Sequence, residues 1–247
     1  MEREIVLTSY NNKSGKNKPS DFITRFVQPI TLDKNRQYVI GLNRIINMSF
    51  TWFNVNSSLN NQKLKYSKDN GTSFTEIELP AGVWSYEDFD NYIKSLTKDN
   101  NTYPITLEFD KTIFRVEITL ANNYQLDLRE SNFNELIGFN KALLTSGTHV
   151  GAKVPNLSQD TDLLNIHCDL INESMVDGQE TDIIYSFSTS VIQPSYSFTL
   201  EPQRVTFSPV NKSRISTIRI YITDGKRRII DLNGQDTAFS LLLKPLN

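Results

Sequence analysis

The sequence predicts a mainly β protein: a single jelly roll, built from two packed antiparallel sheets with about eight strands, into which a small α/β unit is inserted. Segments in which apolar and polar residues alternate dominate the chain, and this is the pattern of half-buried strands. Three such segments precede a middle region with a helical pattern, and five follow it. We therefore expect a jelly-roll domain at residues 1–56 and 159–247 and an inserted α/β domain at residues 57–158.

The three strands before the insertion become longer along the chain. Ile5–Leu7 forms the first strand, and a loop rich in Asn, Lys and Ser follows it at Asn11–Ser20. The second strand, Phe22–Val27, alternates and has one drier face. The third, Gln37–Phe53, ends in an aromatic stretch.

The middle region begins with a hairpin and a helix. The strands Lys63–Tyr66 and Phe74–Leu79 flank Asp69-Asn70-Gly71, a strong turn signal because Asn and Gly tolerate positive φ. Apolar residues then recur at helical spacing from Trp84 to Leu96, so we expect a helix with Ser85 as its N-cap.

The rest of the middle region completes a compact α/β unit. We expect a three-stranded meander, a helical turn that ends at Gly138, and a linker. The strands are Ile105–Phe109, Arg115–Leu120 and Tyr124–Leu128, the turn is Ser131–Glu135, and the linker is Thr145–Ser158.

Five strands are expected after the insertion, with turns at Asp224-Gly225 and Asn233-Gly234. They are Leu163–Ile171, Ile183–Ile192, Ser197–Phe207, Ile215–Thr223 and Ala238–Leu243.

Composition excludes several classes of protein. The chain has 247 residues, a formal net charge of -2 and a pI near 5.8, whereas proteins that bind nucleic acid through its phosphates are usually basic. We therefore expect no direct binding of nucleic acid. No segment resembles a secretory signal or approaches the ~20 apolar residues of a membrane span, so we expect a soluble protein made inside the cell. The single cysteine, Cys168, cannot form an intramolecular disulfide.

The sequence offers few residues for catalysis or metal binding. A zinc site needs three or four clustered ligands, and this chain has only His149, His167 and Cys168 to contribute nitrogen or sulfur. His167 and Cys168 are neighbours on a predicted strand, so their side chains point to opposite faces and cannot act as base and nucleophile. We expect a buried thiol beside a partly exposed imidazole, no cofactor, no metal and no enzymatic activity.

Two features leave a carbohydrate-binding or carbohydrate-hydrolysing jelly roll open as an alternative. Glu76 and Glu78 share one face of a strand at a separation of about 7 Å, close enough for a pair of catalytic carboxylates. Trp52 and Trp84 could stack on sugars. The simpler interpretation is a half-buried strand with an acidic outer face, and tryptophans that lie in the core.

Basic residues gather in the C-terminal third of the chain. They could form a patch that binds phosphate or a partner, or a solvated face that nearby acidic residues neutralise, and the second interpretation is the simpler one. The residues are Arg214, Arg219, Lys226, Arg227 and Arg228.

Four short pieces of the chain carry a resemblance to a known family. They are Tyr38–Ile45 with Ser49–Asn54, Leu136–Phe139, Leu164–Ile171 with Met175–Gly178, and Ile218–Gly225 with Ile229–Asp231 and Gly234–Leu241. In this order along the chain they resemble the penton (minor capsid) proteins of Polinton/Maverick elements and adintoviruses. In the first piece Tyr38 stands where the family has tryptophan, and Arg44 where it has an acidic residue.

This resemblance implies a structural virion protein at the vertices of an icosahedral capsid. It implies a homopentamer of single jelly rolls, seated among double-jelly-roll major capsid proteins, with no cofactor and no catalytic residues. A domesticated copy used as an interaction module is a further alternative. Aromatic residues outside the insertion are candidates for the subunit interface, namely Phe50, Trp52, Phe53, Tyr185 and Tyr196.

Overall fold

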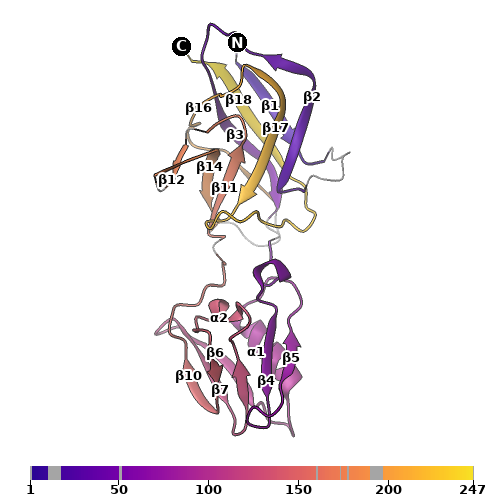
Figure 1. Ribbon diagram of the computed structural model, residues 1–247, viewed down its shortest axis with the longest axis vertical. Coiled ribbons are helices and arrows are strands. Elements are labelled where there is room, and N and C mark those ends of the chain that lie inside the picture. The colour runs from indigo at the N-terminus through magenta and orange to yellow at the C-terminus, as the bar shows by residue number, and fades with distance from the viewer. Residues whose placement is uncertain are drawn as a thin grey trace. The chain divides into compact units, whose positions relative to one another are not determined.

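The computed structural model describes residues 2–10, 18–49, 52–159, 161–172, 174–176, 178–189 and 197–246 (Figure 1). The chain forms two compact units. The first contains Met1–Trp52 and Asp160–Asn247, and the second contains Phe53–Gln159. Each unit has its own cluster of buried apolar side chains.

The first unit is a jelly roll of two antiparallel sheets (Figure 1). All eight of its predicted strands are present, three before the insertion and five after it, so the predicted fold class is confirmed. One sheet has the order β1 (Arg3–Thr8), β18 (Ala238–Pro245), β3 (Tyr38–Ser49), β15 (Ser197–Leu200), and β16 (Ser208–Pro209) also pairs with β3. The other has the order β14 (Ile183–Ser188), β11 (Leu163–Cys168), β17 (Arg214–Thr223), β2 (Asp21–Thr31).

Alternation along the strands places one apolar face of each sheet in the core. On β17 the isoleucines at 215, 218, 220 and 222 are fully buried, whereas Arg219 and Tyr221 between them are not. Phe22 of one sheet stacks on Phe239 of the other, with ring centroids 6.2 Å apart. Each large apolar side chain buried in this way contributes about 1.5–3 kcal/mol to stability.

Several predicted strands of the jelly roll are shorter than expected, among them Leu163–Ile171, which ends at Cys168. The third strand ends at Ser49, and Trp52 lies beyond it, where its side chain packs in the core. The predicted strand Ser197–Phe207 ends at Leu200, shortly before Pro202, which has no N–H for a ladder hydrogen bond, and β16 begins only after the predicted range. At Gly41 a Cβ atom would lie 2.4 Å from the Thr206 carbonyl oxygen, so this glycine lets the intervening segment cross β3 closely.

One hairpin of the jelly roll was not expected from the sequence. Strands β12 (Ser174–Val176) and β13 (Gln179–Thr181) pair with each other around Gly178, whose φ is +76°. Their three-residue length is too short for an alternation pattern to be recognised.

The second unit contains two small antiparallel sheets and two helices. The strand order of one sheet is β5 (Thr75–Glu78), β4 (Lys63–Ser67), β8 (Gln125–Asp127), β9 (Leu143–Leu144). The order of the other is β10 (Gly147–Val150), β7 (Arg115–Leu120), β6 (Ile105–Asp110). The helices are α1 (Tyr86–Thr97) and α2 (Phe133–Leu136), and a 3-10 turn lies at Ser57–Leu59.

The local signals of this unit were predicted correctly. Asn70 and Gly71 have φ values of 57° and 87° in the turn between β4 and β5. At the start of α1 the Ser85 hydroxyl accepts a hydrogen bond from the Asp88 N–H, and the Asp88 carboxylate accepts one from the Ser85 N–H. This capping box satisfies donors that a helix leaves free at its first turn.

The non-local pairing of the same unit differs from the prediction in two places. The three predicted meander strands do not form one sheet, because β8 pairs with β4 rather than with β7. The predicted linker Thr145–Ser158 contains β10, which pairs with β7 instead. Both errors concern the choice of a partner strand, which depends on tertiary contacts rather than on local composition.

Gly138, the predicted helix cap, provides a test of packing in the second unit. Its φ is +74°, and an added Cβ would lie 2.2 Å from the Lys153 carbonyl oxygen. We expect Gly138→Ala to lower the free energy of unfolding, measured by urea denaturation, by about 2–4 kcal/mol. Alanine is strained at this left-handed φ, and its Cβ would overlap the Lys153 carbonyl oxygen. Gly234→Ala is the control, because Gly234 has a φ of +77° but nothing within 4 Å of its Cβ position. Equal losses in the two variants would contradict the close contact.

Candidate functional site on the outer face of the jelly roll

A network of polar side chains covers the outer face of the sheet formed by β14, β11, β17 and β2. Its centre is His167 of β11, which lies directly opposite Tyr221 of β17 in the strand register. The two rings stack with centroids 4.2 Å apart and an interplanar angle of 10°. On its other side Tyr221 lies opposite Asp21 of β2, so the network reaches across three strands.

His167 is buried and makes a hydrogen bond with each ring nitrogen. Nδ1 lies 2.7 Å from Oδ1 of Asp182, and Nε2 lies 2.9 Å from the Thr223 hydroxyl. An ionised carboxylate only accepts hydrogen bonds, so Nδ1–H donates a hydrogen bond to Asp182. In the tautomer with its proton on Nδ1, Nε2 accepts a hydrogen bond from the Thr223 hydroxyl. The expectation of a partly exposed imidazole was wrong, because the ring of Tyr221 covers this histidine.

Asp182 is the shared acceptor of the network. Both of its oxygens accept from the Tyr221 hydroxyl, each at 2.9 Å, and Oδ1 also accepts from His167. Burial raises the pKa of the Asp182 carboxyl, but the hydrogen bonds from His167 and Tyr221 outweigh it, so the pKa lies below its ordinary value. Burial, and then the hydrogen bond to Asp182, hold the pKa of Tyr221 well above its ordinary value.

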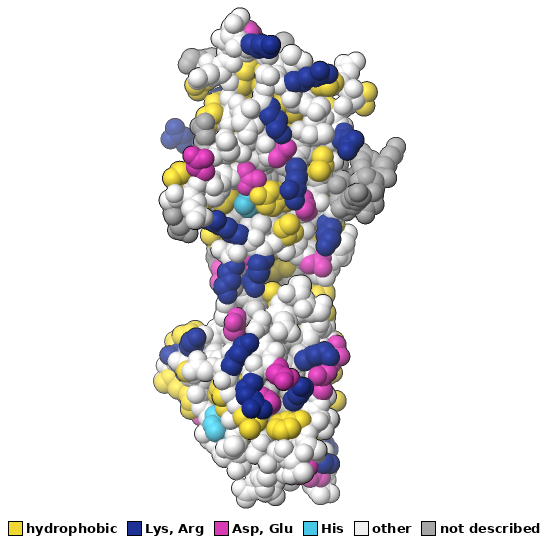
Figure 2. All heavy atoms as spheres, viewed as in Figure 1, with side chains coloured by type: hydrophobic (Ala, Val, Ile, Leu, Met, Phe, Trp, Pro, Cys, Tyr) yellow, Lys and Arg dark blue, Asp and Glu magenta, His cyan; other side chains and the backbone are white. Residues whose placement is uncertain are grey.

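Two basic residues of this region, Arg219 and Lys212, are paired with acidic neighbours. Arg219 donates two hydrogen bonds of 2.8 Å to Asp21, and its guanidinium lies 4.8 Å from the centre of the Tyr221 ring. Lys212 forms an ion pair of 2.7 Å with Asp169. Figure 2 shows basic and acidic side chains interspersed over the jelly roll. This arrangement favours a solvated, internally paired face over a patch that binds phosphate.

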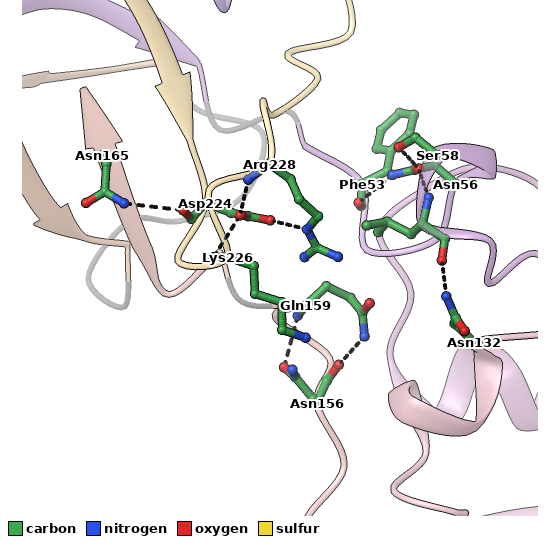
Figure 3. Close-up of polar contacts among 11 residues, drawn as sticks. Phe53, Asn56, Ser58, Asn132, Asn156, Gln159, Asn165, Asp224, Lys226 and Arg228 are labelled. Carbon is green, nitrogen blue, oxygen red and sulfur yellow. Dashed lines mark hydrogen bonds and ion pairs between the residues drawn. The ribbon is translucent and has the colours of Figure 1, made fainter. Parts of the chain in front are cut away.

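At the predicted turn Asp224-Gly225, Asp224 pairs with the guanidinium of Arg228 (Figure 3). The Asp224 carboxylate accepts from the N–H groups of Lys226 and Arg228 at 2.9 and 2.8 Å, and from Nε of Arg228 at 2.7 Å. Its carbonyl oxygen accepts from the Asn165 side chain at 3.3 Å. These bonds fix the loop that follows β17.

The thiol that neighbours His167 faces the opposite way, as expected. Cys168 is fully buried in the jelly-roll core, and burial raises the pKa of its thiol to about 12. A thiol in this state is not a nucleophile at neutral pH. Within the part of the chain that the structure describes, no three His, Cys, Asp or Glu side chains are arranged to hold a metal ion. No described helix is both long and apolar enough to cross a membrane.

Glu76 and Glu78 lie on the exposed face of β5, where both are close to Lys63. Glu76 accepts a hydrogen bond of 2.7 Å from Lys63, and Glu78 lies 3.9 Å from the same ammonium group. The hydrogen bond from Lys63 lowers the pKa of Glu76. A glycosidase needs one carboxyl with a raised pKa to act as general acid, and Glu76, whose pKa is lowered, is not suited to that role.

The candidate interface residues occupy different environments. Trp52 is only 5% exposed and packs in the jelly-roll core, so its side chain has almost no surface left for a partner. Tyr185 of β14 is half-buried and stacks on Phe187, and Phe53 is half-buried in the second unit. Phe50 and Tyr196 lie outside the described residues.

The network on the outer face can be tested by removing one hydroxyl. Tyr221→Phe keeps the ring stack but removes both hydrogen bonds to Asp182, so we expect the free energy of unfolding at pH 7 to fall by about 1 kcal/mol. The folded pKa of Asp182 is depressed, so its contribution is present above the ordinary pKa and is lost as the pH falls through the folded pKa. The difference between the variant and the unchanged protein should therefore narrow at pH 3. Tyr185→Phe is the control, and a difference that is the same at both pH values would contradict the role of Asp182.

Cys168 provides a second test. Because its thiol is fully buried and protonated, we expect no reaction with iodoacetamide at pH 8 until the chain unfolds, measured by mass spectrometry with and without urea. Alkylation of the folded protein at the rate of a free thiol would show that β11 does not pack as described.

The sequence matches no protein-family model and no curated protein. The structure is similar to the crystal structure of the mavirus penton protein, with a TM-score of 0.53 and 10% sequence identity over 100% of both chains. A chain in the structure of the Sputnik virophage is similar over 98% of this chain and 97% of its own, with a TM-score of 0.42 and 11% identity. The match to the mavirus protein covers both the jelly roll and the insertion. The chain therefore has the fold of a penton protein, a jelly roll with an inserted α/β unit.

Proposed function

We propose that the chain is a structural capsid protein, a penton (minor capsid) protein of the Polinton/Maverick and adintovirus family. The observation that carries this proposal is the position of the insertion: an α/β unit interrupts the jelly roll between β3 and β11, in a fold similar along its whole length to the mavirus penton protein. The four collinear sequence pieces support the same family. In this role the protein acts in the virion, at the capsid vertex, and needs neither cofactor nor catalytic residues.

The jelly roll has two flanks suited to head-to-tail contact in a homopentamer. Edge strands β1 and β2 lie on one flank and β14 on the other (Figure 1), and among the described strands β15 and β16 both pair only with β3 at the remaining edge. A ring closes when one flank of each copy contacts the other flank of the next. Tyr185 on β14 remains a candidate for this contact.

The flank of β1 and β2 carries exposed apolar side chains. Ile30 of β2 pairs with Ile215 of β17, and the next pair joins Arg25 to Thr217. The β2 residues between Arg25 and Ile30 therefore outnumber those opposite them and form a bulge at the sheet edge. Val27 in this bulge is 101% exposed, and Ile23 of the same strand and Val6 of β1 are 45% and 53% exposed. Apolar residues that project from a sheet edge are typical of a surface that a partner covers.

The other proposed partner is a double-jelly-roll major capsid protein that surrounds the vertex. Contacts of this kind bury well over ~1,000 Å² when they are stable. If the ring forms only around the major capsid protein, the isolated chain stays monomeric in dilute solution.

Val27→Asp tests the proposed contact between copies. Val27 is fully exposed, so we expect the variant to fold normally but to lose self-association, because the contact would bury an uncompensated charge. The measurement is sedimentation velocity at high protein concentration, where the unchanged protein should form a species with five times the 28.3 kDa mass of one chain. Val154→Asp, at an exposed valine of the second unit, is the control.

Two results would contradict this account. A two-fold dimer that persists in Val27→Asp would contradict the pentamer. A pentamer that forms equally well with and without the substitution would contradict the contact at Val27.

A further inference from the structure

The second unit contains a groove between the first turns of α1 and the end of β6. Its volume is about 370 Å³, and both of its walls come from the insertion itself. The side chains that give it chemical character are Tyr86, Glu87, Asp90, Glu108, Phe109 and Lys111. A groove of this size accommodates a few side chains of a partner rather than a large cofactor.

One wall of the groove is aromatic. The rings of Tyr86 and Phe109 stack with centroids 4.5 Å apart, and Phe114 packs against Phe109 at 6.4 Å. Phe114 is 59% exposed and has a φ of +51°, a conformation that is strained for a bulky residue. Ile113 beside it is also exposed. The turn between β6 and β7 thus holds apolar surface in water next to the groove.

The charged side chains of the groove are mainly acidic. Glu87 and Glu108 are exposed and form no ion pair with any described residue, whereas Asp90 is paired with Lys94. Glu108 also lies directly opposite Glu117 on β7, and like charges in that position repel each other. Lys111 is the one cationic side chain among the six that were named for the groove. The N-terminus of α1 adds partial positive charge from the helix dipole, and Glu87 and Asp88 in the first turn offset it. An incoming cation would therefore relieve repulsion, and an anion would increase it.

The edge of β6 offers free backbone groups at the same place. β6 is an edge strand of its sheet, and the Leu107 N–H points away from β7 because it donates to Asp90 at 2.9 Å. In an antiparallel pair this direction repeats every second residue, so the N–H and C=O of Phe109 also point away from β7. No described residue accepts a hydrogen bond from the Phe109 N–H on that side.

We propose that this groove binds a short, extended, basic segment of another protein. A lysine or arginine side chain lies against the Tyr86 and Phe109 rings, and the carboxylates of Glu87 and Glu108, which line the same groove, attract it. The segment's backbone pairs with Phe109 at the strand edge. Cations are attracted to aromatic faces, and extended peptides commonly add to exposed sheet edges. The proposal concerns the insertion alone and does not depend on the proposed assembly of the jelly roll.

The test measures peptide binding by the full-length chain. The probe is a fluorescein-labelled octapeptide of alternating arginine and valine, with a glutamate–valine octapeptide as its counterpart, and the readout is fluorescence anisotropy. We expect the basic peptide to bind and the acidic peptide not to bind. The double variant Glu87→Gln with Glu108→Gln should weaken binding of the basic peptide about tenfold.

A matched variant separates the groove from general charge attraction. Glu76→Gln with Glu78→Gln removes the same two charges from an exposed face of β5 in the same unit, and we expect it to bind as the unchanged protein does. Tyr86→Leu should weaken binding while both carboxylates remain. Equal weakening by the two glutamine pairs, equal binding of both peptides, or no binding of the basic peptide would overturn the proposal.

Discussion

The burial of the two sheets of the jelly roll against each other is the constraint on which the rest of the first unit depends. Side chains alternate along every strand, so burial of Ile218, Ile220 and Ile222 commits Arg219 and Tyr221 to the outer face. The same rule sends the Cys168 thiol into the core and the His167 ring outward. A shift of one residue in register would reverse all of these positions at once.

The outer face shows how polar groups are accommodated once the core is satisfied. His167 is surrounded by Tyr221, Asp182 and Thr223, and each polar atom of its ring has a partner. Paired groups of this kind hold the strands in register but offer little unsatisfied charge to a ligand. Side chains that are exposed without such partners lie elsewhere. One group is the Val27 bulge at the edge of the jelly roll, and the other is the acidic groove of the insertion, beside the strained Phe114.

Local signals in the sequence were sufficient to predict most elements of this fold. Asn70-Gly71 and Ser85 were recognisable because a turn or a cap depends on a few adjacent residues. Three features could not be predicted: the pairing of β8 with β4, the strand β10, and the hairpin of β12 and β13. Strands this short show no clear alternation pattern, and the pairing of β8 and β10 depends on tertiary contacts. His167 was misjudged for the same reason, because Asp182 and Tyr221 reach it only through the strand register. The acidic groove likewise depends on how α1 lies against β6.

The central claim is that this jelly roll occupies capsid vertices as a ring of five. The measurement that tests it most directly is electron cryo-microscopy of particles formed when the chain is co-expressed with a double-jelly-roll major capsid protein of the same element. The account predicts density for five copies of this jelly roll around each five-fold axis, with β1 and β2 of one copy facing β14 and β15 of the next. Particles whose vertices lack this density, while the chain remains outside them, would contradict it.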